Sequence, residues 1–88
     1  MAKRITGDLT VAATSAAQEV AIGYKDFLMV NNSDNVVYFR EKSRDGKDVT
    51  AETGYALQAR SQTPHAITAD VLSILASGEA DVRILFID

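Results

Sequence analysis

The sequence of 88 residues contains no cysteine and no tryptophan, and it has a single histidine and a single proline. Without cysteine the chain forms no disulfide scaffold, thiolate metal site or thiol nucleophile, while its redox compartment stays open. The longest apolar runs, such as Phe27 to Val30, are 4 residues long, whereas a membrane-spanning helix needs about 20. We therefore expect neither an integral membrane protein nor a disulfide-rich one.

An excess of positive charge is also absent. The chain has 9 Lys and Arg against 12 Asp and Glu, a formal charge of −3, and the two signs are interspersed. Proteins that bind nucleic acid by neutralising phosphates need clustered positive charge, so we expect no nucleic-acid partner. Residues 1–4 carry the positive charges of Lys3 and Arg4. They are followed by Ile5-Thr6-Gly7-Asp8, where a signal peptide requires a continuous apolar region, so we expect no secretion signal.

Residues that could carry chemistry are few. His65 follows Pro64 and has no Cys, Asp or Glu at a spacing typical of a metal site. A nucleophile needs a base and an orienting partner, and His65 is the one histidine available. The 5 glycines stand far apart, which is typical of turns and not of a phosphate-binding loop. We therefore predict no catalytic, metal-binding or cofactor-binding residue, and a protein that is not an enzyme.

The chain is rich in β-branched residues that occur in short runs. Val, Ile and Thr make up 21 of the 88 residues, and Gly, Asn, Asp and Ser separate the runs. This pattern predicts one all-β domain over residues 1–88, a small antiparallel β-sandwich or jelly-roll-like barrel of about seven or eight short strands. Because so short a domain buries only about 60% of its unfolded surface, we also expect it to oligomerise. The predicted strands are residues 9–12, 18–22, 27–31, 36–40, 55–60, 66–69, 71–76 and 82–87.

Two of these segments also have features of helices. Residues 15–22 begin with Ser15 to Gln18, which fits a capping box, and residues 69–77 precede Gly78, a residue typical of a helix C-terminus. Turn residues and β-branched residues flank both segments and favour strands. The choice between strand and helix stays open for both.

Two hairpins are predicted from the pattern of runs and turns. Residues 27–31 and 36–40 flank a turn of small polar residues, and residues 71–76 and 82–87 flank a turn that contains Gly78. Apolar residues occur on both faces of the first hairpin, so we expect it to be covered on both sides, either at the centre of a sandwich or at a subunit interface.

One strongly polar stretch lies between the hairpins. Residues 40–48 hold 7 charges of alternating sign, and the turn dipeptide Asp45-Gly46 predicts a long hairpin or loop. Such a loop is either a solvated tip or a contact loop that binds a partner by complementary charge. The candidate partner-binding residues in it are Arg40, Lys42, Arg44, Asp45 and Lys47.

The order of runs and turns supports a resemblance. The order begins with Phe27 to Asp34 and Val36-Val37-Tyr38, continues with Gly54 to Leu57, and ends with Leu72 to Gly78 and Val82 to Leu85. Over Val20 to Asp88 the chain resembles small structural proteins of tailed bacteriophage particles. The resemblance implies a β-sandwich or jelly-roll domain that assembles, often as a trimer, on the virion surface as a capsid decoration (cement) protein.

The resemblance also implies partners and a location. The partners are the major capsid protein or other virion proteins, and the protein is made in the host cytoplasm and found on the capsid surface. Residues 1–7 are then a flexible arm that reaches over the capsid lattice, with Ala2, Lys3, Arg4 and Ile5 as candidate contact residues. Longer fibre proteins have repeats or heptads, which this sequence lacks, so a compact decoration protein is favoured over a fibre shaft.

Two alternative functions stay open. A tail, baseplate or head-fibre component would share the fold and the lack of catalytic residues. A glycan-binding module would need exposed aromatic side chains, and Tyr24, Tyr38 and Tyr55 are its candidates beside Phe. Because tryptophan is absent, we rank glycan binding lower.

Overall fold

The computed structural model describes residues 4–42, 46–65 and 69–87, and this part of the chain is built from β-strands joined by loops. The segments with open alternatives, 15–22 and 69–77, contain strands, as the flanking turn residues favour. The strands are β1 (Ile5–Ala13), β2 (Gln18–Ala21), β3 (Phe27–Asn31), β4 (Val37–Glu41), β5 (Tyr55–Leu57), β6 (Gln62–His65), β7 (Val71–Ala76) and β8 (Ala80–Ile87).

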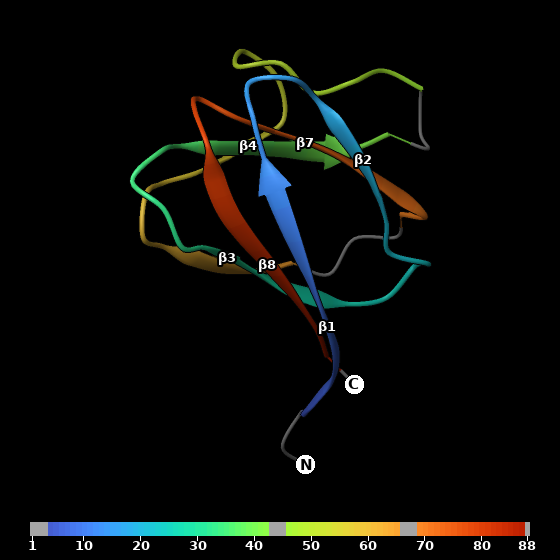
Figure 1. The fold of residues 1–88 in the computed structure, drawn as a ribbon. Coiled ribbons are helices and arrows are strands. Elements are labelled where there is room, and N and C mark those ends of the chain that lie inside the picture. Colours follow the sequence, from blue (N-terminus) through green and yellow to red (C-terminus); the bar gives the residue numbers. More distant parts are fainter. Residues whose placement is uncertain (1–3, 43–45, 66–68, 88) are drawn as a thin grey trace.

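The strands form two antiparallel sheets of 4 strands each (Figure 1). The first sheet has the order β1-β8-β3-β6 and the second the order β2-β7-β4-β5. Strand β1 pairs with β8, β2 with β7, β3 with β6 and β4 with β5, so the chain is a long antiparallel hairpin rolled into two layers. This is the jelly-roll arrangement. The predicted fold class is confirmed.

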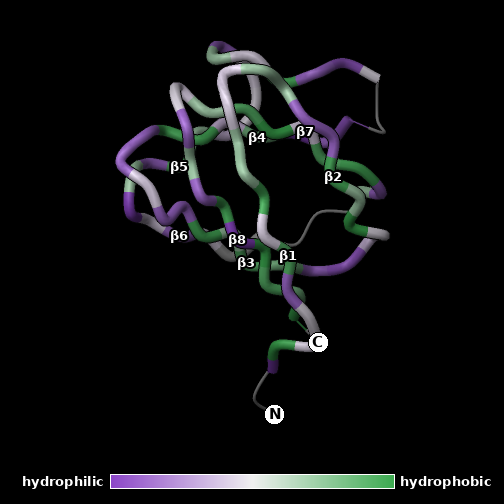
Figure 2. The backbone as a smooth tube through the Cα atoms, viewed as in Figure 1, coloured by the Kyte–Doolittle hydropathy of each residue, from purple (hydrophilic) through white to green (hydrophobic). Residues whose placement is uncertain are grey.

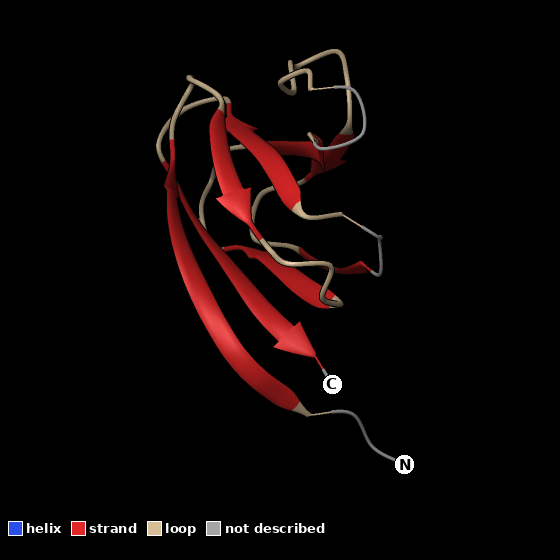
Figure 3. Ribbon diagram, turned by 90° about the vertical axis from the view of Figure 1, so that its right-hand side faces the viewer, coloured by secondary structure: helices blue, strands red, loops and turns tan. Residues whose placement is uncertain are grey.

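The core lies between the two sheets, which Figure 3 shows as separate layers. Alternate residues of each strand point inward: in β3 Phe27 and Met29 are fully buried, while Leu28 and Val30 between them are half-buried. The other fully or almost fully buried apolar residues of the core are Ala13, Ile22, Val37, Phe39, Ala69, Leu72, Ile74, Ala76, Val82 and Ile84.

Both predicted hairpins are wrong. Strands β3 and β4 belong to different sheets, and so do β7 and β8. Each connection is therefore a corner that carries the chain from one layer to the other. Within the chain only one face of each strand packs in the core, and Leu28, Val30 and Tyr38 on the other face are half-buried. Coverage of that other face by a second subunit stays a prediction.

Side-chain hydrogen bonds explain why the turn after β3 forms a corner. The Asn31 side chain is buried, and its Nδ2 donates to the backbone oxygens of Asn35, Leu57 and Gln58 at 2.7, 3.1 and 3.0 Å. The Ser33 hydroxyl donates to Asn31 Oδ1 at 2.6 Å. These bonds fasten the corner to the loop that follows β5, and Figure 2 shows the corner as a hydrophilic bend beside the apolar strands.

Several predicted boundaries also change. The sixth strand is Gln62–His65 and not 66–69: Ala69 lies outside the strands, and 66–68 lie outside the described residues. Pro64 disfavours a central strand, but β6 is an edge strand, where proline is tolerated. Residues 5–7, predicted to belong to a flexible arm, are part of β1, where Ile5 pairs with Ile87.

Candidate partner-binding surfaces

The charged stretch 40–48 begins in β4 and continues into the connection to its paired strand β5. Its candidate residues have different environments. Arg40 lies in β4 and Lys42 directly after it, and both are half-buried. Lys47 is exposed, whereas Arg44 and Asp45 lie outside the described residues. The stretch therefore does not present all its charges to solvent.

Two neighbouring strands fasten this stretch to the second sheet. The Lys42 ammonium forms ion pairs with Glu19 of β2 and with Asp48, the latter at 3.0 Å from Nζ to Oδ1. The buried hydroxyl of Ser73 in β7 accepts a hydrogen bond from the Val49 backbone N–H at 3.0 Å and donates one to Asp48 at 3.3 Å. Val49 itself is only 1% exposed. The chain after residue 46 therefore folds back over the outer face of this sheet.

The Lys42–Asp48 pair shifts the protonation of both groups. Donating hydrogen bonds to Glu19 and Asp48 raises the pKa of the Lys42 ammonium, and accepting the hydrogen bond from Lys42 lowers the pKa of the Asp48 carboxyl. Because folding lowers the pKa of the Asp48 carboxyl, the charged carboxylate stabilises the fold at pH values above its ordinary pKa of 3.8. This stabilisation is lost as the pH falls through the pKa of Asp48 in the folded protein. Because folding raises the pKa of the Lys42 ammonium, the charged ammonium stabilises the fold at pH values below its ordinary pKa of 10.5. This stabilisation is lost as the pH rises through the pKa of Lys42 in the folded protein.

These directions make the stability of the protein depend on pH through this pair. We expect Lys42→Met to lower the urea midpoint of unfolding over the neutral range, from about pH 5 to about pH 9. The difference from the wild type shrinks as the pH falls below 3.8 and passes the lowered pKa of Asp48. It also shrinks as the pH rises above 10.5 and passes the raised pKa of Lys42. Urea titrations of both proteins across this range measure it, and a difference that is constant with pH would contradict the assignment.

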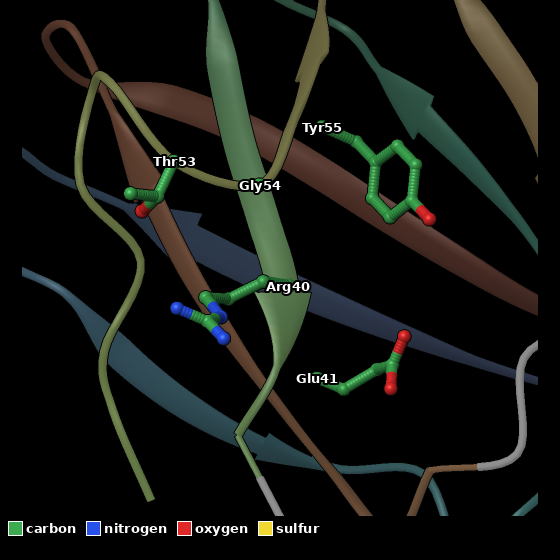
Figure 4. A pocket seen from close by; sticks show the side chains of 5 residues that line it. All are labelled: Arg40, Glu41, Thr53, Gly54 and Tyr55. Atoms are coloured by element: carbon green, nitrogen blue, oxygen red, sulfur yellow. The ribbon is translucent and has the colours of Figure 1, made fainter. Parts of the chain in front are cut away.

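A hollow of about 360 Å³ lies where β4 ends and β5 begins (Figure 4). It is lined by Arg40, Glu41, Thr53, Gly54 and Tyr55. The Tyr55 side chain is 51% exposed, and its ring lies 5.5 Å from that of Phe39. In Figure 4 the Tyr55 and Glu41 side chains point to one side of β4, and the Arg40 side chain points to the other. An exposed ring beside a carboxylate can bind a polar ligand with a flat apolar face.

The N-terminal candidates lie on the other sheet. Ala2 and Lys3 are outside the described residues, Arg4 is exposed, and Ile5 at the start of β1 is 59% exposed. Since β1 and β4 belong to different sheets, the structure does not join Arg4 and Ile5 with Arg40 and Lys42 into one site.

The outer face of the first sheet carries an apolar stripe that was not predicted from the sequence. It consists of Leu28, Val30, Leu85 and Ile87, all half-buried although they point away from the core. Leu28 lies directly opposite Leu85, and Val30 lies opposite Arg83. The signal was present in the sequence, because these residues alternate with the core residues of the same strands, but predicted hairpin pairing hid which face they share.

The structure contains no metal-binding cluster within 4–42, 46–65 and 69–87, where no three His, Cys, Asp or Glu residues are placed to hold an ion. In the same ranges there is no helix long and apolar enough to cross a membrane. His65 is the last residue of β6, and its backbone pairs with Phe27. Comparison of the chain with protein-family models, curated proteins and solved structures found no match.

Proposed function

We propose that this protein is a non-enzymatic structural protein of a tailed-bacteriophage particle, a capsid decoration (cement) protein that binds the outer surface of the head. Its partners are the major capsid protein or other virion proteins, and it acts as a homo-oligomer on the capsid surface. The resemblance of residues 20–88 to such proteins suggested this function. Capsid and lectin domains both use jelly rolls, so the fold is compatible with it and does not decide it.

The observation that carries the proposal is the apolar stripe. A decoration protein needs one face that binds a protein surface and another that stays in solvent, and contiguous apolar groups on a surface mark binding sites. On the second sheet the segment around Val49 folds over the outer face, where Ser73 is fully buried. On the first sheet Leu28, Leu85 and Ile87 retain solvent contact. The first sheet is therefore the face proposed to bind the head.

Immunogold labelling of intact virions from the source, with an antibody to this chain, tests the function itself. Dense labelling of heads supports capsid decoration. Labelling confined to tails would transfer the proposal to a tail, baseplate or head-fibre component. Absence of label from all particles would overturn the virion proposal.

The binding face is tested by a pair of matched variants. We expect Leu85→Gln to weaken co-sedimentation with heads that lack this protein by at least about tenfold, because a polar amide replaces an apolar contact at the centre of the stripe. Leu75→Gln is the control, since Leu75 is also half-buried but points outward from the second sheet. Equal losses for both variants would show that the first sheet is not the binding face.

Glycan binding is the second candidate, and one observation favours it. The hollow beside Tyr55 combines an exposed aromatic ring with the carboxylate of Glu41 on the same side of β4 (Figure 4). Aromatic rings bind the apolar faces of sugars, and charged groups bind their substituents. A glycan array probed with the wild type and with Tyr55→Ala distinguishes the candidates, because only glycan binding depends on this ring.

A further inference from the structure

The edges of the two sheets differ in how well they are protected against pairing with another strand. Exposed edges invite such pairing, and proteins shorten them or place proline in them. Among the described strands β2 has 4 residues, β5 has 3, and β6 has 4 and contains Pro64. Edge strand β1 has 9 residues, from Ile5 to Ala13. Figure 3 shows it along the margin of its sheet.

The backbone of β1 is oriented for pairing on its open side. Gln18 Nε2 donates to the backbone oxygen of Ala12 at 2.7 Å, so this oxygen points away from β8. Backbone direction alternates along a strand, so the N–H and C=O of Thr10 and Asp8 also point to the open side. Both residues are exposed. The Gln18 amide occupies the edge at Ala12, which leaves the portion around Asp8 and Thr10 available.

The open side of β1 borders a groove. A hollow of about 440 Å³ separates Leu9 to Ala12 of β1 from Gln18 to Ala21 of β2, at the margin where the two sheets come apart. Leu9 is half-buried, and Val11 and Val20 are each 7% exposed. A strand added to β1 would therefore gain backbone hydrogen bonds and also cover apolar side chains.

We propose that this edge pairs with β1 of a second copy of the chain, antiparallel and about a two-fold axis at Leu9. In this register Asp8 lies opposite Thr10 of the second copy, so no two carboxylates face each other. Each copy contributes the same strand, which closes the contact as an isologous dimer. The two first sheets become one continuous sheet. The pairing is two-fold, unlike the trimer implied by the resemblance, and it does not depend on the proposed function.

The two ends of β1 complement each other in this arrangement. Ile5 is 59% exposed at one end of the strand. At the other end a hollow of about 540 Å³ is lined by residues 10, 12–14 and 79–81. The register of β1 shifts by one residue between Ile5 and Gly7. Ile5 of each copy therefore lies near Ala12 of the other, at the border of this hollow. Each copy therefore supplies one exposed apolar side chain and one site to receive it.

Sedimentation velocity from about 5 to 500 µM tests the dimer, a range suited to a small interface. We expect a concentration-dependent dimer in the wild type. Thr10→Pro removes only an N–H that points away from β8, so it should raise the dissociation constant at least tenfold while the circular dichroism spectrum stays unchanged. Thr10→Ala, which keeps the N–H, is the matched control and should dimerise like the wild type.

Hydrogen exchange of the wild type provides a readout that needs no variant to fold. The amides of Asp8 and Thr10 should become protected as concentration rises, whereas those of Gly7 and Leu9, which face β8, should be protected throughout. A protein that stays monomeric to 500 µM, or a dimer in which the Asp8 and Thr10 amides exchange freely, would overturn the proposal. So would a folded Thr10→Pro that dimerises as tightly as Thr10→Ala.

Discussion

Asn31→Ala should destabilise the fold by about 3 kcal/mol, because buried hydrogen-bonding groups that lose their partner cost about 1–3 kcal/mol each. The Asn31 amide binds three backbone oxygens and accepts a bond from Ser33, and the residue is 1% exposed. The oxygen of Leu57 lies in a buried bond, so water does not easily replace the lost donor. Domains of this size are stable by only about 5–10 kcal/mol, so the loss is a large fraction of the total.

Chemical denaturation followed by circular dichroism measures this effect. Asn32→Ala is the matched control, since the neighbouring Asn32 side chain makes exposed hydrogen bonds to Asp81 and Arg60. We expect it to cost less than about 1 kcal/mol. Asn31→Asp should be at least as harmful as Asn31→Ala, because a carboxylate cannot donate to the three oxygens and buries a charge. Similar stabilities for Asn31→Ala and Asn32→Ala would show that the corner does not depend on the buried amide.

Gly54→Ala should also destabilise by about 3 kcal/mol, from two sources that add. The residue has a φ of +82°, where a side chain costs about 1–2 kcal/mol. A Cβ there would lie 2.5 Å from the backbone oxygen of Phe39 and 3.0 Å from Val49 Cγ2. Phe39 is a core residue of β4, so its backbone cannot move away without disturbing the core, and such overpacking typically costs about 1–3 kcal/mol.

Gly23→Ala separates the two contributions. Gly23 has a φ of +59° and nothing within 4 Å of an added Cβ, so this variant carries the conformational cost without the clash. The difference in unfolding free energy between the two variants measures how closely residue 54 approaches β4. If Gly54→Ala were no worse than Gly23→Ala, the loop after Val49 would not be held against this strand.

The strands could be predicted from the sequence more reliably than their pairing. Alternating runs such as Phe27 to Asn31 identify a strand because the period of two is local, and this strand has the predicted bounds. Pairing is not local: Leu28 lies opposite Leu85 through backbone bonds between segments far apart in the chain. The polar turn after β3 fits a hairpin equally well in sequence, and only the bonds of Asn31 to the loop after β5 make it a corner.

The candidate sites show the same limit. From the sequence, Lys42 is a candidate for contact with another protein. The sequence did not reveal that Lys42 forms ion pairs with Glu19 and Asp48 of its own chain. The alternation of Leu28 and Leu85 with core residues was visible in the sequence, but the pairing that brings them together on one outer face was not. Exposed Ile5 was a candidate from the sequence, and the structure places it in edge strand β1 instead of a free arm.

The position of β8 has a consequence for how the protein forms during synthesis. Strand β8 is the last strand in the sequence, yet it lies between β1 and β3 and is the neighbour that they share. Until residues 80–87 have left the ribosome, β1 has no strand to pair with and the first sheet cannot close. Because the pairing of β1 with β8 closes a loop over almost the whole chain, the first sheet is expected to form slowly and only after translation of this strand. Until then the apolar faces of β1 and β3 stay exposed, and nascent chains on the same messenger can meet through them.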